Sequence, residues 1–360
     1  EIFVDIPEEQ FRELEKTYHL LAAGESEPVI CQLANLPDAK KLAIIDYFSH
    51  ERFDAKAERF REMRQFASWN QILYSGIMEA LGYAKNQTVF RKLAARLPFE
   101  ALLNEKKHTK ASDLLIYIQG LLFGTAGLLP SQETSFDWRR IKDQAAKDYV
   151  EELEKIWANF SKRLGLEPLP REDWLFFRLR PVNFPTRRIA GASIILLRFF
   201  ESGFLEKLLQ LFSSQKENPR KAARELIKAF TCQTSGYWAQ FYTFSESADD
   251  YNSDKKVTLI GSSRAKEIVV NIVLPAIFGF ASETGNSQLK NQCQQIYFEF
   301  PKTTTNIIER KMIARLFSDS SEARESITTA AKQQGLIHLY KLFCRRNECS
   351  RCQKVASKLE

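Results

Sequence analysis

The sequence is poor in the residues that interrupt helices. Its 360 residues include only 14 glycines and 12 prolines. A fold of many short strands needs such residues at its tight turns, so this shortage argues against a turn-rich all-β protein. The hydrophobic fraction of 44% is ample for a packed interior and argues against a disordered chain. The composition therefore predicts an all-α, two-lobed multi-helix bundle with at most one small β-hairpin.

Long apolar runs are also missing. The longest, 268–280, is interrupted by Asn271 and Pro275 and is shorter than the roughly 20 residues that cross a bilayer. The first residues do not contain a basic segment followed by an apolar one, which is the pattern of a signal peptide. These absences predict a soluble, cytoplasmic protein without a membrane partner.

No catalytic motif can be recognised in the sequence. The four histidines are scattered without a His-x3-His pair, and there is no Gly-x-Ser-x-Gly elbow. The carboxylates on predicted helices are explained by surface ion pairs. Whether the protein is an enzyme therefore stays open at this stage.

Helical periodicity is what the sequence does contain. Between 137 and 165 apolar residues recur every three or four positions, which places them on one face of a helix that Asp137 can cap and Gly165 can end. The same reasoning predicts further helices at 7–23, 38–66, 68–81, 86–97, 111–123, 186–201, 204–212, 219–230, 262–280, 288–298, 306–317 and 322–346.

Two short segments and one linker complete the predicted organisation. The aromatic segment 237–244 and the β-branched segment 257–260 are typical of strands and flank a polar loop, so the sequence allows one small hairpin there. The proline- and charge-rich segment 165–173 predicts a boundary between an N-terminal lobe, 1–165, and a C-terminal lobe, 166–360.

Three closely spaced cysteines lie near the C-terminus in the pattern Cys344-x4-Cys349-x2-Cys352. A Cys-x2-Cys turn lets two thiolates reach one ion, so the pattern predicts a zinc site or, as the second choice, an iron–sulfur cluster. The fourth ligand is Cys31, Cys232, Cys293 or a water molecule. His338 lies about 9 Å of helical rise before Cys344, too far to share the ion. The alternative is that the three thiols are small buried side chains or belong to a flexible reduced tail.

The excess positive charge is concentrated in the same region. Of the formal net charge of +7, a net of +6 falls in 301–360, which contains twelve lysines and arginines against six acids. Arg345, Arg346 and Arg351 alternate with the three cysteines, and such a local field attracts nucleic acid or another polyanion. Basic C-terminal tails also occur on proteins that bind neither.

Two further segments are candidate anion sites. Arg178, Arg180, Arg187 and Arg188 surround a proline-initiated helix start, where free amides and the helix dipole favour an anion. Their alternative role is to pair with acids such as Glu172, Asp173 and Glu201. The segment Ser262-Ser263-Arg264 opens another helix and can hold an oxyanion, but it is too short for a nucleotide-binding loop, and an ordinary serine cap is the simpler explanation.

Several segments together resemble the uncharacterised bacterial domain-of-unknown-function family 2851. They are WNQILY at 69–74, ALGYAKN at 80–86, LLFGTAGLL at 121–129, RLRP at 178–181, NFPTRRIA at 183–190 and the terminal cysteines. The family has no established activity, so the resemblance implies only that the cysteine pattern and the arginine–proline segment serve structure or binding. Its members often carry glutamine at the position of His338. Longer members have a strand-rich N-terminal segment that this chain lacks.

These observations lead to three hypotheses about function. The first is a non-catalytic, nucleic-acid-associated helical module with a structural metal at its C-terminus. The second is a protein-interaction scaffold or homodimer that does not bind nucleic acid. The third is the helical part of an enzyme whose catalytic segment is absent.

Overall fold

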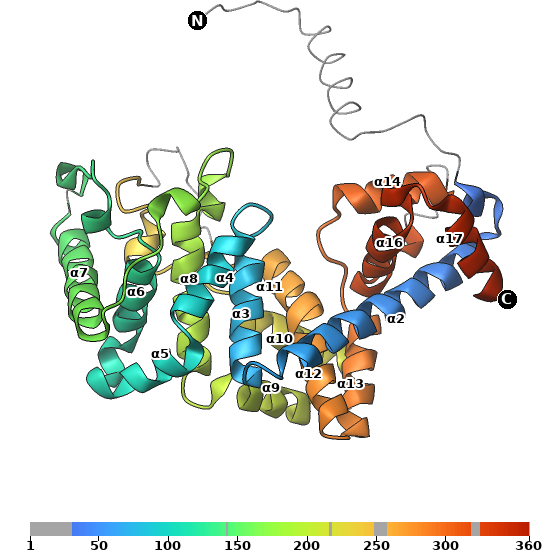
Figure 1. The fold of residues 1–360 in the computed structure, drawn as a ribbon, viewed down its shortest axis with the longest axis horizontal. Coiled ribbons are helices and arrows are strands. Elements are labelled where there is room, and N and C mark those ends of the chain that lie inside the picture. The colour runs from blue at the N-terminus through green and yellow to red at the C-terminus, as the bar shows by residue number, and fades with distance from the viewer. Residues whose placement is uncertain (1–30, 142, 216–217, 248–257, 318–324, 360) are drawn as a thin grey trace, which may run out of the picture. The chain divides into compact units, whose positions relative to one another are not determined.

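The computed structural model describes residues 31–141, 143–215, 218–247, 258–317 and 325–359, and these residues are mostly helical and form no β-strand. The predicted all-α fold is confirmed. The α-helices labelled in Figure 1 are α2 (Asp38–Met63), α3 (Trp69–Leu81), α4 (Gln87–Arg96), α5 (Phe99–Glu105), α6 (Leu114–Thr125), α7 (Gln144–Leu164), α8 (Pro185–Phe199), α9 (Gly203–Ser214), α10 (Pro219–Phe230), α11 (Ser262–Ile268), α12 (Leu274–Glu283), α13 (Ser287–Phe298), α14 (Ile307–Phe317), α16 (Ala330–Leu342) and α17 (Cys349–Ala356).

The chain divides into two compact units. The terminal unit combines both ends of the chain, residues 1–49, 305–327 and 334–360, and the central unit contains 50–304 and 328–333. This division differs from the predicted lobes 1–165 and 166–360. Gly165 does end α7 in the left-handed conformation, but the segment after it packs against α6. The Leu169 N–H donates to the Thr125 carbonyl at 2.8 Å, and the Trp174 indole donates to the Ala126 carbonyl at 2.7 Å. The predicted linker is therefore part of the central core.

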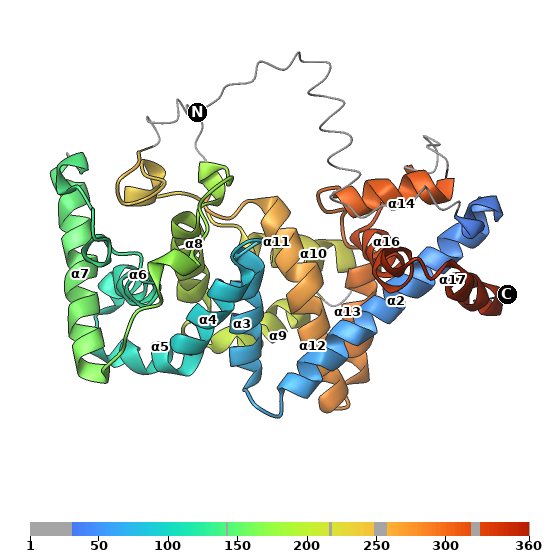
Figure 2. The same ribbon diagram turned by 45° about the horizontal axis from the view of Figure 1, so that its top comes forward.

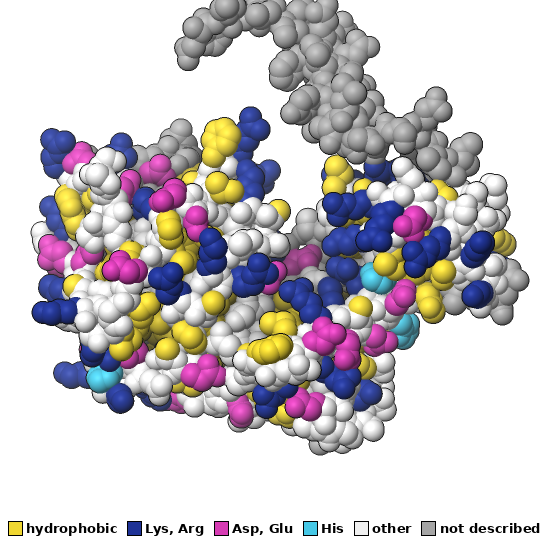
Figure 3. Space-filling view, viewed as in Figure 1, with side chains coloured by type: hydrophobic (Ala, Val, Ile, Leu, Met, Phe, Trp, Pro, Cys, Tyr) yellow, Lys and Arg dark blue, Asp and Glu magenta, His cyan; other side chains and the backbone are white. Residues whose placement is uncertain are grey.

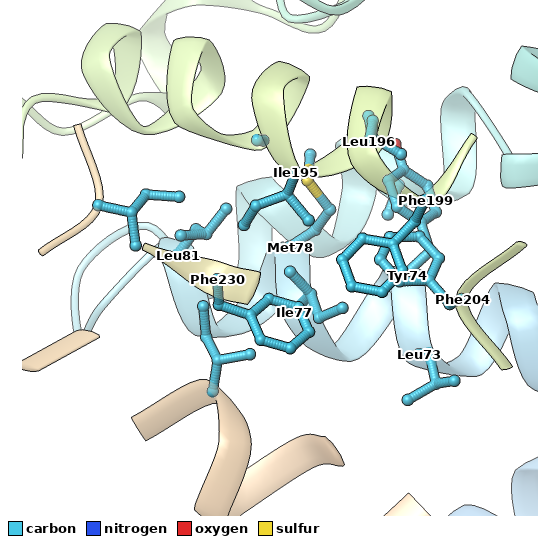
Figure 4. Close-up of a cluster of buried hydrophobic side chains, with 14 of the residues drawn as sticks. Leu73, Tyr74, Ile77, Met78, Leu81, Ile195, Leu196, Phe199, Phe204 and Phe230 are labelled. Atoms are coloured by element: carbon cyan, nitrogen blue, oxygen red, sulfur yellow. The ribbon is translucent and has the colours of Figure 1, made fainter. Parts of the chain in front are cut away.

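The core of the central unit is filled by aromatic and aliphatic side chains from several helices. Figure 4 shows α3 side chains directed toward those of α8. Phe199 of α8 stacks on Phe204 at 4.8 Å and on Phe230 at 5.4 Å between ring centroids. Elsewhere in this unit, α6 and α7 lie side by side in both views (Figure 1 and Figure 2). Gly124 permits this approach, because a Cβ atom there would lie 2.2 Å from the Trp157 ring.

Two helical segments of the central unit are long and apolar enough to span a membrane. They are Ala111–Gln132 and Ser262–Glu283, and 78% and 67% of their most apolar windows are buried inside the structure. Burial of this extent is what the core helices of a packed protein show. The absence of a membrane partner stays a prediction.

The terminal unit has a separate apolar core. Short 3₁₀-helix η1 (Gln32–Asn35), the first part of α2, α14, α16 and α17 contribute to it. The largest side chains include Phe48, whose ring meets that of Phe343 at 5.7 Å between centroids. Gly335 of α16 lies against α2, where a Cβ atom would be 2.1 Å from the Ile45 carbonyl oxygen. The first and the last described segments of the chain thus share one small core.

Several predicted boundaries are corrected by the structure. Helix α7 begins at Gln144 with Asp143 as its cap, because Asp137 instead accepts a hydrogen bond from the Arg139 N–H in a separate 3₁₀ turn, Trp138–Arg140. The predicted helix 262–280 contains a π turn, Val269–Val273, directly before Pro275, which has no N–H to donate to the helix. The predicted helix 322–346 is interrupted, because 325–326 are helical, 327–329 are not, and α16 then begins at Ala330.

The small β-hairpin that the sequence allows does not form among the described residues. Tyr237 lies in a 3₁₀-helix, Gly236–Ala239, in which its ring stacks on that of Phe241 at 4.3 Å. Ile260 forms an isolated bridge with Cys232 and does not pair with the aromatic segment. Packing of the aromatic rings thus overrides their strand propensity. The helix predicted at 7–23 lies outside the described residues, and α5 and α17 were not predicted.

Candidate metal centre and arginine clusters

The C-terminal cysteines lie around a tight turn between α16 and α17. A 3₁₀ turn, Cys344–Arg346, follows α16, and Asn347 then adopts the left-handed conformation at φ 56°. The Asn347 N–H donates to the Cys344 carbonyl at 3.3 Å, and the Glu348 N–H donates to the Phe343 carbonyl at 3.0 Å. This pair of bonds is the Schellman pattern that ends helices. It reverses the chain so that Cys349 begins α17 and Cys352 follows one turn later.

Cys31 reaches the same region from the other end of the described chain. It directly precedes η1, and η1 packs against both α14 and α17. Cys31 and Cys344 are half-buried and pack against the apolar core of the terminal unit, of which the buried Cys352 is a member. We call Cys31, Cys344, Cys349 and Cys352 the four-cysteine cluster.

The thiols of this cluster interact electrostatically. Burial, with smaller contributions from the thiols of Cys344, Cys31 and Cys349, raises the pKa of Cys352 to about 12. Burial also raises the pKa of Cys344, with an added contribution from Cys31, while the charge and hydrogen bond of Arg315 oppose the rise. The cluster therefore concentrates four potential thiolates beside one guanidinium.

The other sulfur and imidazole candidates are placed elsewhere. Cys232 and Cys293 are fully buried in the core of the central unit, and burial raises the pKa of Cys232 to about 11. His338 packs its ring toward Phe48, with 6.3 Å between centroids. Within the described residues, no three side chains of His, Cys, Asp or Glu lie as close together as the ligands of one ion. Of the possible fourth ligands named from the sequence, Cys31 is the one that joins the terminal cysteines.

The terminal unit, which contains the four-cysteine cluster, is basic. The described part of the terminal unit contains eleven lysines and arginines against five aspartates and glutamates, a net charge of +6. Figure 3 shows lysine and arginine side chains gathered on the visible face of this unit, over α14 and α16. Arg351 pairs with Glu348 at 3.1 Å. Five exposed cations form no ion pair with any described carboxylate: Arg310, Arg345, Arg346, Lys354 and Lys358.

The arginine segment of the central unit is divided by burial. Arg178 and Arg180 are exposed, and the Arg178 guanidinium lies 5.0 Å from the centroid of the Phe177 ring. Arg187 and Arg188, on the first turn of α8, are only 2% and 5% exposed. The Arg187 guanidinium donates to the Trp238 carbonyl at 2.8 Å and packs over the Tyr242 ring.

Arg188 and Arg264 meet at one tyrosine, and we call Arg188, Arg264 and Tyr83 the arginine–tyrosine cluster. The guanidinium of Arg264 lies 3.3 Å from the centroid of the Tyr83 ring, and that of Arg188 lies 4.9 Å from it. Arg188 also donates to the Tyr83 hydroxyl at 2.8 Å, to the Asn183 side chain and to the Leu259 carbonyl. Burial lowers the pKa of Arg188, which Tyr83 opposes and the like charge of Arg264 reinforces.

The acids proposed as partners of these arginines do not pair with them. Asp173 pairs with Lys92 at 2.8 Å, and Glu201 lies 3.8 Å from Lys106. The serine-cap interpretation of α11 also fails, because no side chain caps this helix and Ser263 instead bonds Thr304 at 2.6 Å. Ser262 and Ser263 are exposed, whereas Arg264 is half-buried.

The fold and these side chains define a helical protein with a cysteine-rich basic unit and a larger unit that buries arginines. The model of the family described as "protein of unknown function (DUF2851)" matches residues 6–306, so the chain belongs to this family. The match covers most of the central unit and ends before α14 and the terminal cysteines. Comparisons with curated proteins and with solved structures find no match.

Sequence reasoning missed Arg315 and Tyr83. Arg315 belongs to α14, and only the folded chain brings it to Cys344. Tyr83 lies in the segment 80–86, which carries the family resemblance, but nothing in the sequence connects it to Arg188 or Arg264. Both residues act through contacts between segments that are distant in the sequence.

Proposed function

We propose that the protein is a non-catalytic, nucleic-acid-associated helical protein that binds the phosphate backbone with the basic surface of its terminal unit. The observation that carries this proposal is the set of exposed cations without a carboxylate partner, which includes Arg345 and Arg346. Unpaired cations on one surface attract a polyanion, and each phosphate that they neutralise releases a condensed counterion. Arg351 lies on the same segment but pairs with Glu348, so it contributes less.

The proposal includes a structural zinc ion held by Cys344, Cys349 and Cys352. Thiolates are preferred ligands of zinc, and they also hold iron–sulfur clusters, which we place second. The ion would fix the turn between α16 and α17, from which Arg345 and Arg346 project. A fixed turn presents these side chains with less loss of conformational entropy on binding.

The test is a titration of the full chain with labelled single- and double-stranded DNA and RNA over a range of salt concentrations. If the five unpaired cations each meet one phosphate, log K on duplex DNA falls with log salt with a slope of about −4.5. The double variant Arg345→Ala/Arg346→Ala should lose two phosphate contacts, which makes the slope less steep by about two units. Its matched control is Arg91→Ala/Arg224→Ala, which removes the same charge from exposed helical positions of the central unit.

Two outcomes would contradict the proposal. The first is no retention of any of the four nucleic acids at low salt. The second is an equal loss of affinity in both double variants, because that result would show an effect of net charge and not of this surface. Light scattering on the same samples checks the homodimer hypothesis, which predicts an oligomer that nucleic acid does not change.

A further inference from the structure

The four-cysteine cluster is assembled from three segments that are far apart in the sequence. Cys31 precedes η1, Cys344 begins the 3₁₀ turn after α16, and Cys349 and Cys352 lie on the first turn of α17. All belong to the terminal unit, and η1 packs directly against α17. No other described part of the chain gathers so many thiols.

We propose that Cys31 is the fourth ligand of a single zinc site and that the ion ties the beginning of the described chain to its C-terminal helix. The inference rests on the structural zinc ion of the proposed function and is independent of nucleic-acid binding. Four thiolates satisfy the tetrahedral preference of structural zinc without a water molecule. With only the three terminal cysteines as ligands, a water molecule would fill the fourth position, and we assign this position to Cys31.

The proposal requires the cysteine side chains to turn toward one another. Tetrahedral zinc–thiolate bonds of about 2.3 Å place the sulfurs about 3.8 Å apart. Among the described residues, no three such side chains lie as close together as the ligands of one ion. Each cysteine turns about a single χ1 torsion between three staggered positions, and we propose that this rotation brings the sulfurs together when the ion binds.

The surroundings compensate the charge of such a site. Zinc with four thiolates carries a formal charge of −2, which a half-buried position disfavours unless cations lie near. Arg315 already bonds Cys344. Arg345, Arg346 and Arg351 come from the segment that contains the ligands. The amides of the first turn of α17 add favourable dipoles for the thiolates of Cys349 and Cys352.

The proposed tie would link the first and the last described segments of the terminal unit. A metal that links Cys31 to Cys344 closes a loop that contains the whole central unit, so it removes conformational entropy from the unfolded chain. We expect the loss of Cys31 to loosen η1 and α17 together, although α17 retains its own two cysteines.

The experiment measures zinc in the full chain by elemental analysis and records the absorbance of its cobalt(II)-substituted form. The wild type should contain one zinc per chain and show the intense visible bands of a tetrahedral four-thiolate cobalt site. Cys31→Ser should lose most of its zinc or show a weakened and shifted cobalt spectrum. Cys31→His, which restores a zinc ligand, should recover the stoichiometry with a spectrum distinct from that of the wild type.

The matched controls are Cys232→Ala and Cys293→Ala, which remove thiols buried in the central unit and should keep one zinc per chain. An unchanged cobalt spectrum in Cys31→Ser would overturn the inference while leaving the zinc ion on the other three cysteines. The absence of zinc from the wild-type protein would overturn both the structural zinc ion and the role of Cys31 as its ligand. Iron and sulfide found in place of zinc would overturn both as well. Salt titrations with the same samples show separately whether nucleic-acid binding fails.

Discussion

Arginine and cysteine occur in both units of this protein, but in opposite settings. In the central unit Arg187, Arg188, Cys232 and Cys293 are all nearly or fully buried. In the terminal unit Arg345 and Arg346 are exposed, and the cysteines gather around a turn. The residue types are the same, yet the buried arginines are tied to carbonyl groups and aromatic rings, whereas the exposed ones are left without a carboxylate. Burial, and not composition, thus decides which arginines can meet an external anion.

The buried arginines organise connections between segments. Arg187 joins α8 to the carbonyls of Trp238 and Phe241, and Arg188 joins it to the Leu259 carbonyl and to Tyr83. Hydrogen bonds from a charged donor contribute about 1.5–3 kcal/mol each, and buried acceptors that lose their donor are destabilising. These side chains therefore act as structural connectors, although the sequence presents them as an anion site.

The largest effect on this comparison should come from Arg188→Ala. It removes the donor of three acceptors, the Leu259 carbonyl, the Tyr83 hydroxyl and the Asn183 side chain. We expect the free energy of unfolding to fall by about 3 kcal/mol, measured by urea denaturation. Arg345→Ala, at an exposed position, is the control and should change it by less than about 0.5 kcal/mol. Equal losses of stability in the two variants would contradict the structural difference between buried and exposed arginines.

The next effect is a loss of stability at alkaline pH that depends on a buried thiol. The pKa of Cys232 is raised by burial from 9.0 to about 11. A pKa raised in the folded state means that the unfolded chain releases this proton first, so the stability is complete below pH 9 and is lost as the pH rises toward 11. Linkage predicts a loss of about 2 kcal/mol at pH 11. Cys232→Ala should not show this alkaline loss of stability. Urea denaturation of both proteins at pH 8 and at pH 11 measures the difference, and an identical pH dependence in the variant would contradict the prediction.

The sequence predicts features that depend on neighbouring residues better than features that depend on contacts between distant segments. Helix α10 begins and ends where expected, because Asn218 and Pro219 define its start through local chemistry. Helix α17 has only eight residues, too few for a periodic pattern, and it was missed. The three terminal cysteines are adjacent in sequence and could be grouped at once. From the sequence, Cys31 was one of three possible cysteine ligands, with Cys232 and Cys293. Only the fold shows that Cys31 lies near the three terminal cysteines.

The burial of Arg188 could not be predicted for a similar reason. Its acceptors come from the loops that contain Tyr83 and Leu259, which lie far from it in the sequence. A proline-initiated helix start with several arginines has the same local pattern whether the guanidiniums point into a core or into solvent. The pattern therefore predicted an anion site, where the structure places an internal network.

A smaller effect is expected for affinity at the basic surface. Arg345→Ala/Arg346→Ala should weaken binding of duplex DNA about 10- to 100-fold at low salt, because each lost phosphate contact removes on the order of 1 kcal/mol. The difference from wild type should shrink as salt rises. Fluorescence anisotropy at two salt concentrations measures both properties, and a salt-independent loss would indicate misfolding of the turn in place of lost charge.

The smallest effect should come from Arg178→Ala, which lies in the same predicted anion segment as Arg188. Arg178 is exposed, and its guanidinium contacts only the ring of the exposed Phe177. Substitution should change the free energy of unfolding by less than about 0.5 kcal/mol. It should also leave duplex affinity within about twofold if the basic surface of the terminal unit carries the binding. A loss of affinity as large as that of Arg345→Ala/Arg346→Ala would instead assign the phosphate contacts to the exposed arginines of the central unit.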